Sequence, residues 1–265
     1  MKKKLQGLIS ILLIVITVGV VIFHTGSMHA KPSSAKTASS AKTSETKTAK
    51  KMTKKEQELA SLPKGVKPTD WDLLLVSGQS PLPAGYKPDL TTIGHFKINK
   101  KVKPHYEALA AAAKKAGYEL TIVSSYRSVE YQKQIYNQHI KDDMAQGKSE
   151  KEAEKDTADY MTKPGTSEHH TGMALDVLTT SYVKDHGNDL SAAFGDTAGG
   201  KWLAQNCAQY GFIIRYPKDK YDITKIKYEP WHIRYVGKEN AEYIMSHHLS
   251  LEEYDQLLKE RDSQK

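Results

Sequence analysis

A polar, lysine-rich tract at residues 31–55 limits where this chain can fold. It reads KPSSAKTASSAKTSETKTAKKMTKK and contains only one apolar side chain larger than alanine. Such a tract buries too little apolar surface to offset the loss of chain entropy. Its serines and threonines also oppose the helix that its alanines and lysines would otherwise favour. We therefore expect a disordered linker over residues 31–60 and a folded domain over residues 61–265.

The segment before the linker is apolar. Lysines at positions 2–4 precede an apolar run from Leu8 to Phe23. This run is long for the apolar region of a signal peptide and short for a membrane span of about 20 residues. We expect residues 1–30 to be a signal peptide or an N-terminal membrane anchor, and the bulky Met28 near a cleavage position favours the anchor. Either one places the domain outside the cytoplasm, with membrane contact only through this segment.

The basic charge of the chain belongs to its N-terminal part. The net charge is +8, and residues 2–4 and 31–55 together carry +10, which leaves about −2 from residue 56 onward. A nucleic-acid partner would require a basic patch on the folded domain, so none is expected. The lysine-rich arm instead suits an anionic surface such as lipid headgroups or wall polymers. Cys207 is the only cysteine, which excludes a disulfide within the chain and a cysteine-rich metal site.

The folded part mixes helical and strand patterns without regular alternation. Residues 70–90 contain three prolines and predict an extended arm with turns. Helical patterns cover residues 103–117, 129–147, 149–162 and 200–211 and return after residue 250. Strand patterns cover residues 118–124, 173–177, 212–216 and 229–237. This order predicts an α+β fold in which a small antiparallel sheet is packed with helices.

Two of these strands each expose a candidate ligand on one face. In TSEHHTGMALDV (166–177), alternation places Asp176 opposite the apolar residues. In EPWHIRYVG (229–237), His232 and Arg234 share the face opposite the apolar side chains. Arg234 would therefore support or line any site that contains His232.

A histidine close to Asp176 would complete a metal site. Two imidazoles and one carboxylate form a zinc site with an open position for water. Strand alternation favours His170 over His169, but Gly172 can interrupt the alternation, so spacing does not decide between them. The alternative is that both are ordinary surface histidines.

Glu229 adds a group for proton transfer. It lies three residues before His232, and Pro230 between them breaks regular strand geometry. The carboxylate could therefore reach water on the metal without being a ligand itself. The alternative is an ordinary carboxylate at the entry of a strand.

Both motifs resemble those of a known family. SEHHTGMALD resembles the S-x-H-x-x-G-x-A-x-D motif of VanY-type D-alanyl-D-alanine carboxypeptidases, and EPWHIRYVG resembles their E-P-W-H-x-R-Y-V motif. WDLLLV, PLP and SSYRSVEYQ are also similar to family segments, so the resemblance covers about residues 70–247. It implies a fold shared with lysostaphin-like peptidases and hedgehog domains, and one zinc ion per chain.

The resemblance also assigns roles to residues. By position in the motifs, it implies His169, Asp176 and His232 as zinc ligands and Glu229 as the base. His170 falls where relatives often carry glutamine, which leaves open whether it packs or also touches the substrate.

The expected substrate is a peptidoglycan stem peptide that loses its terminal D-alanine. A carboxypeptidase must hold a free terminal carboxylate, and the fork-shaped, permanently charged Arg127 suits this task. The resemblance adds Gln132 and Ser167 as substrate contacts.

Three other functions remain open. An L,D-carboxypeptidase acting on tetrapeptide stems would use the same ligands and base. An endopeptidase is disfavoured by Arg127, because an internal bond offers no carboxylate. A non-catalytic wall-binding module is disfavoured by the intact ligand and base set. Nothing indicates an oligomer, and a monomer is favoured.

Overall fold

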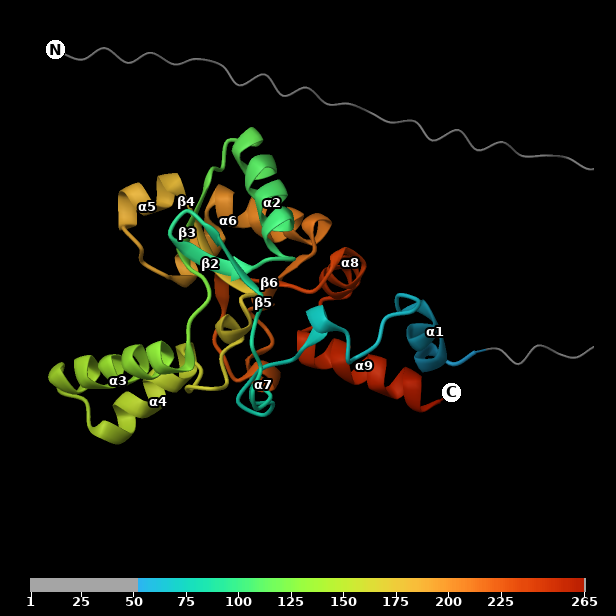
Figure 1. Ribbon diagram of the computed structural model, residues 1–265, viewed down its shortest axis with the longest axis horizontal. Helices are drawn as coiled ribbons and strands as arrows, with labels where there is room; N and C mark the ends of the chain where they lie inside the picture. The colour runs from blue at the N-terminus through green and yellow to red at the C-terminus, as the bar shows by residue number, and fades with distance from the viewer. Residues whose placement is uncertain (1–51, 265) are drawn as a thin grey trace, which may run out of the picture. The chain divides into compact units, whose positions relative to one another are not determined.

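The computed structural model describes residues 52–264, and two antiparallel sheets form the framework of this region (Figure 1). The larger sheet has the strand order β3-β4-β6-β5, and the smaller sheet is the hairpin β1-β2. The strands are β1 (Leu90–Ile93), β2 (Phe96–Asn99), β3 (Leu120–Ser124), β4 (Ala174–Thr179), β5 (Phe212–Tyr216) and β6 (Glu229–Tyr235). The predicted antiparallel sheet is confirmed, and β4 and β6 form its centre.

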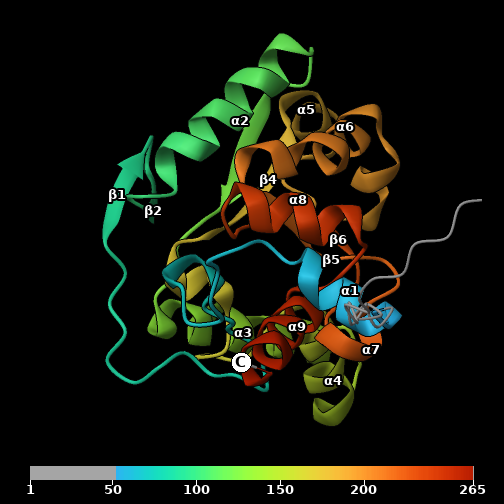
Figure 2. The same cartoon turned by 90° about the vertical axis from the view of Figure 1, so that its right-hand side faces the viewer.

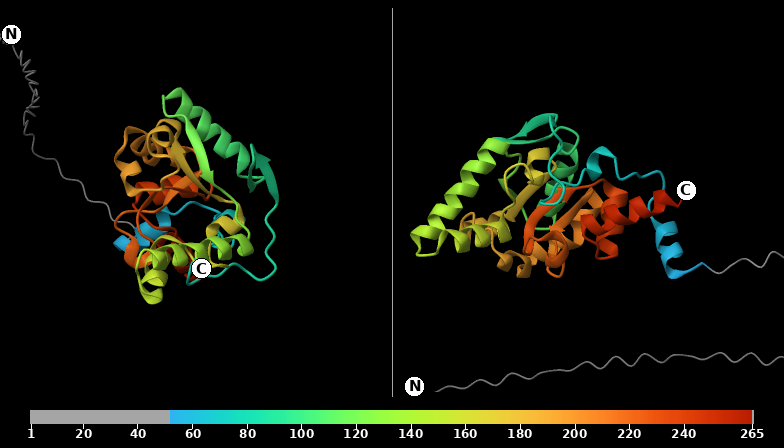
Figure 3. Two further views of the ribbon diagram at one scale, coloured as in Figure 1. Left: turned by 90° about the vertical axis from the view of Figure 1, so that its left-hand side faces the viewer. Right: turned by 90° about the horizontal axis from the view of Figure 1, so that it is seen from below.

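Helices surround the larger sheet. They are α1 (Lys54–Ser61), α2 (Lys103–Lys115), α3 (Val129–Ala145), α4 (Glu150–Tyr160), α5 (Thr180–His186), α6 (Ala198–Asn206), α7 (Tyr221–Thr224), α8 (Lys238–Ser246) and α9 (Leu251–Ser263). Helices α3 and α4 pack side by side as a pair that projects from the sheet (Figures 1 and 3). The α+β class expected from the sequence is therefore confirmed.

Helix ends follow the capping signals in the sequence. Ser149 caps the start of α4 and Ser250 caps the start of α9, each with a capping box that closes through a glutamate three residues later. Pro104 lies in the first turn of α2, and Gly117 follows the helix with a φ of +88°. These capping bonds, together with the proline and the glycine, are local sequence signals, which explains why the ends of these helices could be predicted.

The apolar faces of the elements form two clusters. The first lies against the back of the larger sheet, where strand residues meet α2 and α6. Its members include Tyr106, Leu109, Met173, Leu175, Val177, Leu203, Cys207 and Ile233. The second joins α1, α8 and α9. Because the first cluster fixes the back of β4 and β6, their polar side chains are held on the opposite face.

The expected start of the folded domain needs correction. Helix α1 is closed by a capping box at Thr53, and its Leu59 is buried in the second cluster. Figures 1 and 2 show α1 lying beside α9. The boundary expected at residue 60 therefore falls inside a helix, because apolar contact with α9 outweighs the weak helix preference of the tract.

The segment 70–90 is mostly extended, as predicted, but it also contains a short 3₁₀ helix at Trp71–Leu73. The hairpin β1-β2 that follows was not predicted. Across residues 52–264, no helix combines the length and apolar character needed to cross a membrane. The expected signal or anchor, and the linker up to residue 51, lie outside the described residues.

Candidate active site

The centre of the larger sheet brings two of the expected ligands together. Asp176 on β4 pairs directly with His232 on the neighbouring strand β6, and Ser124 of β3 lies on the other side of Asp176. Both side chains project from the face opposite the core and are nevertheless buried. The cross-strand register therefore sets their spacing.

His169 reaches the same place from a tight turn. It belongs to a 3₁₀ helix, Glu168–Thr171, and its backbone N–H donates to the capping side chain of Ser167. Gly172 ends this helix with a φ of +68°, and a Cβ there would lie 2.9 Å from the backbone nitrogen of Asn99. Only glycine fits this left-handed turn against the hairpin. The turn breaks strand alternation at Gly172, so His169 and not His170 faces Asp176.

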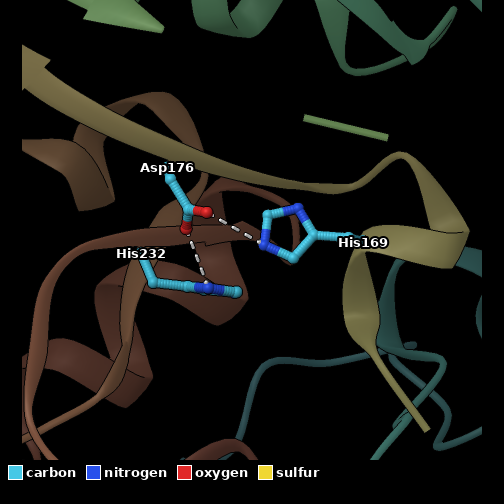
Figure 4. A group of neighbouring side chains, drawn as sticks. All are labelled: His169, Asp176 and His232. Atoms are coloured by element: carbon cyan, nitrogen blue, oxygen red, sulfur yellow. Dashed lines mark ion pairs between the residues drawn. The ribbon is translucent and has the colours of Figure 1, made fainter. Parts of the chain in front are cut away.

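The three side chains form a compact cluster (Figure 4). One potential ligand atom from each of His169, Asp176 and His232 lies within 4.8 Å of the others. Nε2 of His169 is 3.3 Å from Asp176 Oδ2, and Nδ1 of His232 is 3.1 Å from Asp176 Oδ1. The aspartate thus stands between the two imidazoles.

The hydrogen bonds of His169 indicate a cation at this cluster. Its Nδ1 lies 2.7 Å from the carbonyl oxygen of Ser125, which can only accept, so Nδ1 carries the proton. Burial lowers the pKa of His169 to about 4, so Nε2 keeps a lone pair at neutral pH. That lone pair faces the carboxylate of Asp176, and a cation between two facing buried acceptors would offset the cost of burying them.

The charges around His232 favour a cation as well. Burial alone would lower the pKa of His232, but the carboxylates of Asp176, Glu168 and Glu229 outweigh it and raise the pKa to about 9. Burial would likewise raise the pKa of Asp176, yet the two imidazoles hold it well below its usual range. Two imidazole nitrogens and a carboxylate oxygen are a donor set that zinc prefers. The residues present therefore fit a zinc ion.

Glu229 lies at the start of β6 beside this cluster. Its Oε2 is 3.4 Å from Nδ1 of His232. Burial raises the pKa of Glu229 to about 8, so its carboxyl group can both take and return a proton near neutral pH. A buried carboxyl group with a raised pKa in a cavity is a candidate for acid–base catalysis.

The cluster lies in a cavity of about 800 Å³. The wall of this cavity also contains Arg127, Ser167 and Glu229 and extends along α4. Nε of Arg127 is buried and has no hydrogen-bond partner within residues 52–264. A buried guanidinium nitrogen without a partner is suited to an anionic group entering the cavity.

The structure does not bring Gln132 into the cavity. This side chain is completely buried in α3, and its Nε2 donates to the carbonyl oxygen of Thr162 at 2.8 Å. It is not among the described residues that line the cavity. Its Nε2 thus holds the chain that follows α4, whereas its Oε1 is buried and has no hydrogen-bond partner among the described residues. The expected substrate contact stays a prediction.

His170 points away from the cluster. Its Nδ1 lies 2.7 Å from the carbonyl oxygen of Arg127, and its Nε2 accepts from the backbone N–H of Gly165 at 3.1 Å. Both ring nitrogens are therefore occupied by backbone groups. His170 ties two loops of the cavity wall together, and no nitrogen remains for a metal.

Sequence reasoning missed a buried ion network beside the site. Oε1 of Glu168 accepts from Nε of Arg215 at 2.8 Å and from Nη1 of Arg234 at 2.7 Å. Arg215 also pairs with Glu252 of α9. The available signal was an arginine inside the otherwise apolar strand FIIRY, which would be costly to bury without a partner. Arg234 supports the site, as its shared face with His232 suggested.

Comparisons with known proteins agree with this geometry. The family model described as VanY, D-alanyl-D-alanine carboxypeptidase, matches residues 95–238. YodJ of Bacillus subtilis (strain 168) is 43% identical over 198 residues, which cover 71% of this chain and 68% of YodJ. Both strands of the metal cluster lie inside the matched region.

Two solved structures are also similar. The vancomycin-resistance D,D-pentapeptidase VanY, in complex with Zn(II), matches with a TM-score of 0.62 and 34% identity, over 70% of this chain and 99% of that one. The LD-carboxypeptidase LdcB matches with a TM-score of 0.60 and 41% identity, over 70% of this chain and 86% of that one. Because the family model spans more than half of the chain, the chain belongs to the VanY family of D-alanyl-D-alanine carboxypeptidases.

Proposed function

We propose that this protein is a zinc-dependent D,D-carboxypeptidase that removes the terminal D-alanine from peptidoglycan stem peptides. The observation that carries the proposal is the buried cluster of His169, Asp176 and His232 in the wall of a cavity. These three residues would hold one zinc ion per chain. When bound, the ion supplies a Lewis acid that acidifies water and polarises the scissile carbonyl.

Glu229 supplies proton transfer in this mechanism. It would take a proton from the attacking water and return it to the nitrogen of the leaving D-alanine. Its raised pKa, about 8, keeps both protonation states accessible, and its place beside His232 keeps it near the reacting atoms. Burial excludes bulk water from this exchange.

Arg127 would recognise the free C-terminal end of the substrate. Its guanidinium group would bind the terminal carboxylate, which would satisfy the partnerless Nε. Ser167 lines the same wall but already caps the turn that carries His169. We assign Ser167 to the support of that turn as well as to the substrate-facing wall.

The site of action would be the cell wall. The VanY family relationship supports an extracytoplasmic location, and we propose that residues 1–30 provide the export signal or membrane anchor. The lysine-rich residues up to 51 would then act as a tether, so that the domain beginning near residue 52 reaches its substrate.

An L,D-carboxypeptidase that acts on tetrapeptide stems is the second candidate, because the similarity to LdcB reaches 41% identity. The ligands, Glu229 and Arg127 would serve both reactions equally. Incubation of the zinc-loaded protein with a pentapeptide stem and a tetrapeptide stem, followed by mass spectrometry, distinguishes them. The proposal predicts loss of one alanine from the pentapeptide and an unchanged tetrapeptide; preferential shortening of the tetrapeptide would establish the second candidate.

A further inference from the structure

One carboxylate oxygen of Glu168, in the buried ion network, has no hydrogen-bond partner among the described residues. Oε1 of Glu168 accepts from both Arg215 and Arg234, and all three side chains are fully buried. Oε2 of the same carboxylate has no hydrogen-bond partner among the described residues. The ion pairs therefore account for one oxygen and leave the other unexplained.

The second oxygen faces a ring nitrogen that is also without a partner. Nε2 of His232 lies 3.8 Å from Oε2 of Glu168, and it too lacks a hydrogen-bond partner among residues 52–264. This distance is longer than a hydrogen bond. A buried acceptor and a buried ring nitrogen nevertheless face each other here, and neither has another hydrogen-bond partner among the described residues.

We propose that Glu168 is a positioning residue that keeps the proton of His232 on Nε2, so that Nδ1 is free to bind the metal. An imidazole with a proton on one nitrogen offers the lone pair of the other. A carboxylate held ionised by two guanidinium groups can only accept, so it selects the Nε2–H tautomer. Nδ1 is the nitrogen that lies 3.1 Å from Asp176.

His169 shows the same principle with the opposite nitrogen. The carbonyl oxygen of Ser125 lies 2.7 Å from its Nδ1, which leaves Nε2 directed at Asp176. The two histidines thus present different nitrogens to one place, and each needs its own acceptor behind the ring. For His232, the carboxylate that faces Nε2 is that of Glu168.

Distant elements hold Glu168 in place. Both terminal nitrogens of Arg215 donate to Glu252 at the start of α9, at 2.9 and 2.6 Å. Arg234 donates to the carbonyl oxygens of Asp72 and Leu74, each at 2.9 Å. The carboxylate is therefore fixed relative to the sheet.

The variant E168Q tests the inference, which rests on the proposed ligand set. Glutamine retains an oxygen for the two arginines but can present an N–H to His232, where an acceptor is required. We expect zinc affinity, measured by competition with a chelator, to fall about 10–100-fold, the usual effect of losing the partner behind a metal-bound histidine. The matched control E119Q removes an exposed carboxylate that pairs only with Lys114, outside this network, and should bind zinc as the wild type does.

A measurement on the wild type removes dependence on the stability of E168Q. In zinc-loaded protein labelled with ¹⁵N-histidine, NMR should show His232 with its proton on Nε2 and His169 with its proton on Nδ1. Zinc bound through Nε2 of His232 would overturn the inference alone. A His232 ring that does not respond to zinc would overturn the proposed ligand set as well. Unchanged zinc affinity in a folded E168Q would also contradict the role of Glu168.

Discussion

At the scale of single residues, two adjacent histidines have different environments. His169 directs Nε2 at Asp176, whereas both ring nitrogens of His170 are bound by backbone groups. We expect His169→Ala to abolish tight zinc binding, because one of three ligands is lost. His170→Ala should retain stoichiometric zinc, measured by elemental analysis after gel filtration. Loss of zinc in His170→Ala together with its retention in His169→Ala would contradict the ligand assignment.

Glu229 is the residue whose removal should separate chemistry from metal binding. We expect Glu229→Gln to keep zinc and the melting temperature but to lose about 10²–10⁴-fold in kcat, the usual contribution of a positioned acid or base. Kinetics on a stem pentapeptide, with zinc content measured in parallel, provide the check. Near-normal turnover in the zinc-loaded variant would remove Glu229 from the mechanism.

Arg127 should recognise the terminal carboxylate. Arg127→Met should keep zinc but lose about 10–150-fold in kcat/KM, because a charge-assisted hydrogen bond contributes about 1.5–3 kcal/mol. Lysine should restore only part of the loss, since it lacks the planar fork. An amidated pentapeptide should impair the wild type by a similar factor and Arg127→Met much less, because both changes remove one contact. Losses that multiply independently would favour an endopeptidase.

At the scale of elements, periodicity and capping signals predicted most helices and strands, but packing decided the rest. The helices capped by Ser149 and Ser250 carry these caps in the sequence. Helix α1 carries the same signal from Thr53 to Glu56, but it lies in a lysine-rich tract, and its packing depends on contact with α9, which is distant in sequence. The same limit applies to the site. Local alternation could not foresee the turn before Gly172 or a buried glutamate shared by two arginines.

Helix α1 provides the prediction at this scale. A chain that begins at residue 62 loses Leu59, which belongs to the same apolar cluster as Leu257 and Leu258 of α9. Since burial of a leucine stabilises by about 1.5–3 kcal/mol, we expect its melting temperature to fall by about 3–12 °C relative to residues 52–265. Leu59→Ala in the longer chain should reproduce most of this loss, and the exposed Gln57→Ala should not. Equal melting temperatures for the two chains would show that α1 does not stabilise the domain.

At the scale of the whole molecule, the sheet, the cavity and the metal cluster form one arrangement. The back of the sheet is the largest part of the apolar core, and its centre positions Asp176 and His232 on the other face. The hairpin closes against the turn that carries His169, through the bond from Asn99 to Gly172. Folding of the domain therefore builds the metal site, and zinc should in turn stabilise the folded state.

The most direct test is a zinc titration of the metal-free domain with release of D-alanine as the readout. The protein is stripped with a chelator, zinc is added in fractions of an equivalent, and D-alanine released from a stem pentapeptide is measured at each step. We predict that release rises linearly and stops rising at one zinc per chain, and that His169→Ala shows no such break. Release that is independent of zinc, or that continues to rise to two equivalents, would contradict a carboxypeptidase with a single zinc ion.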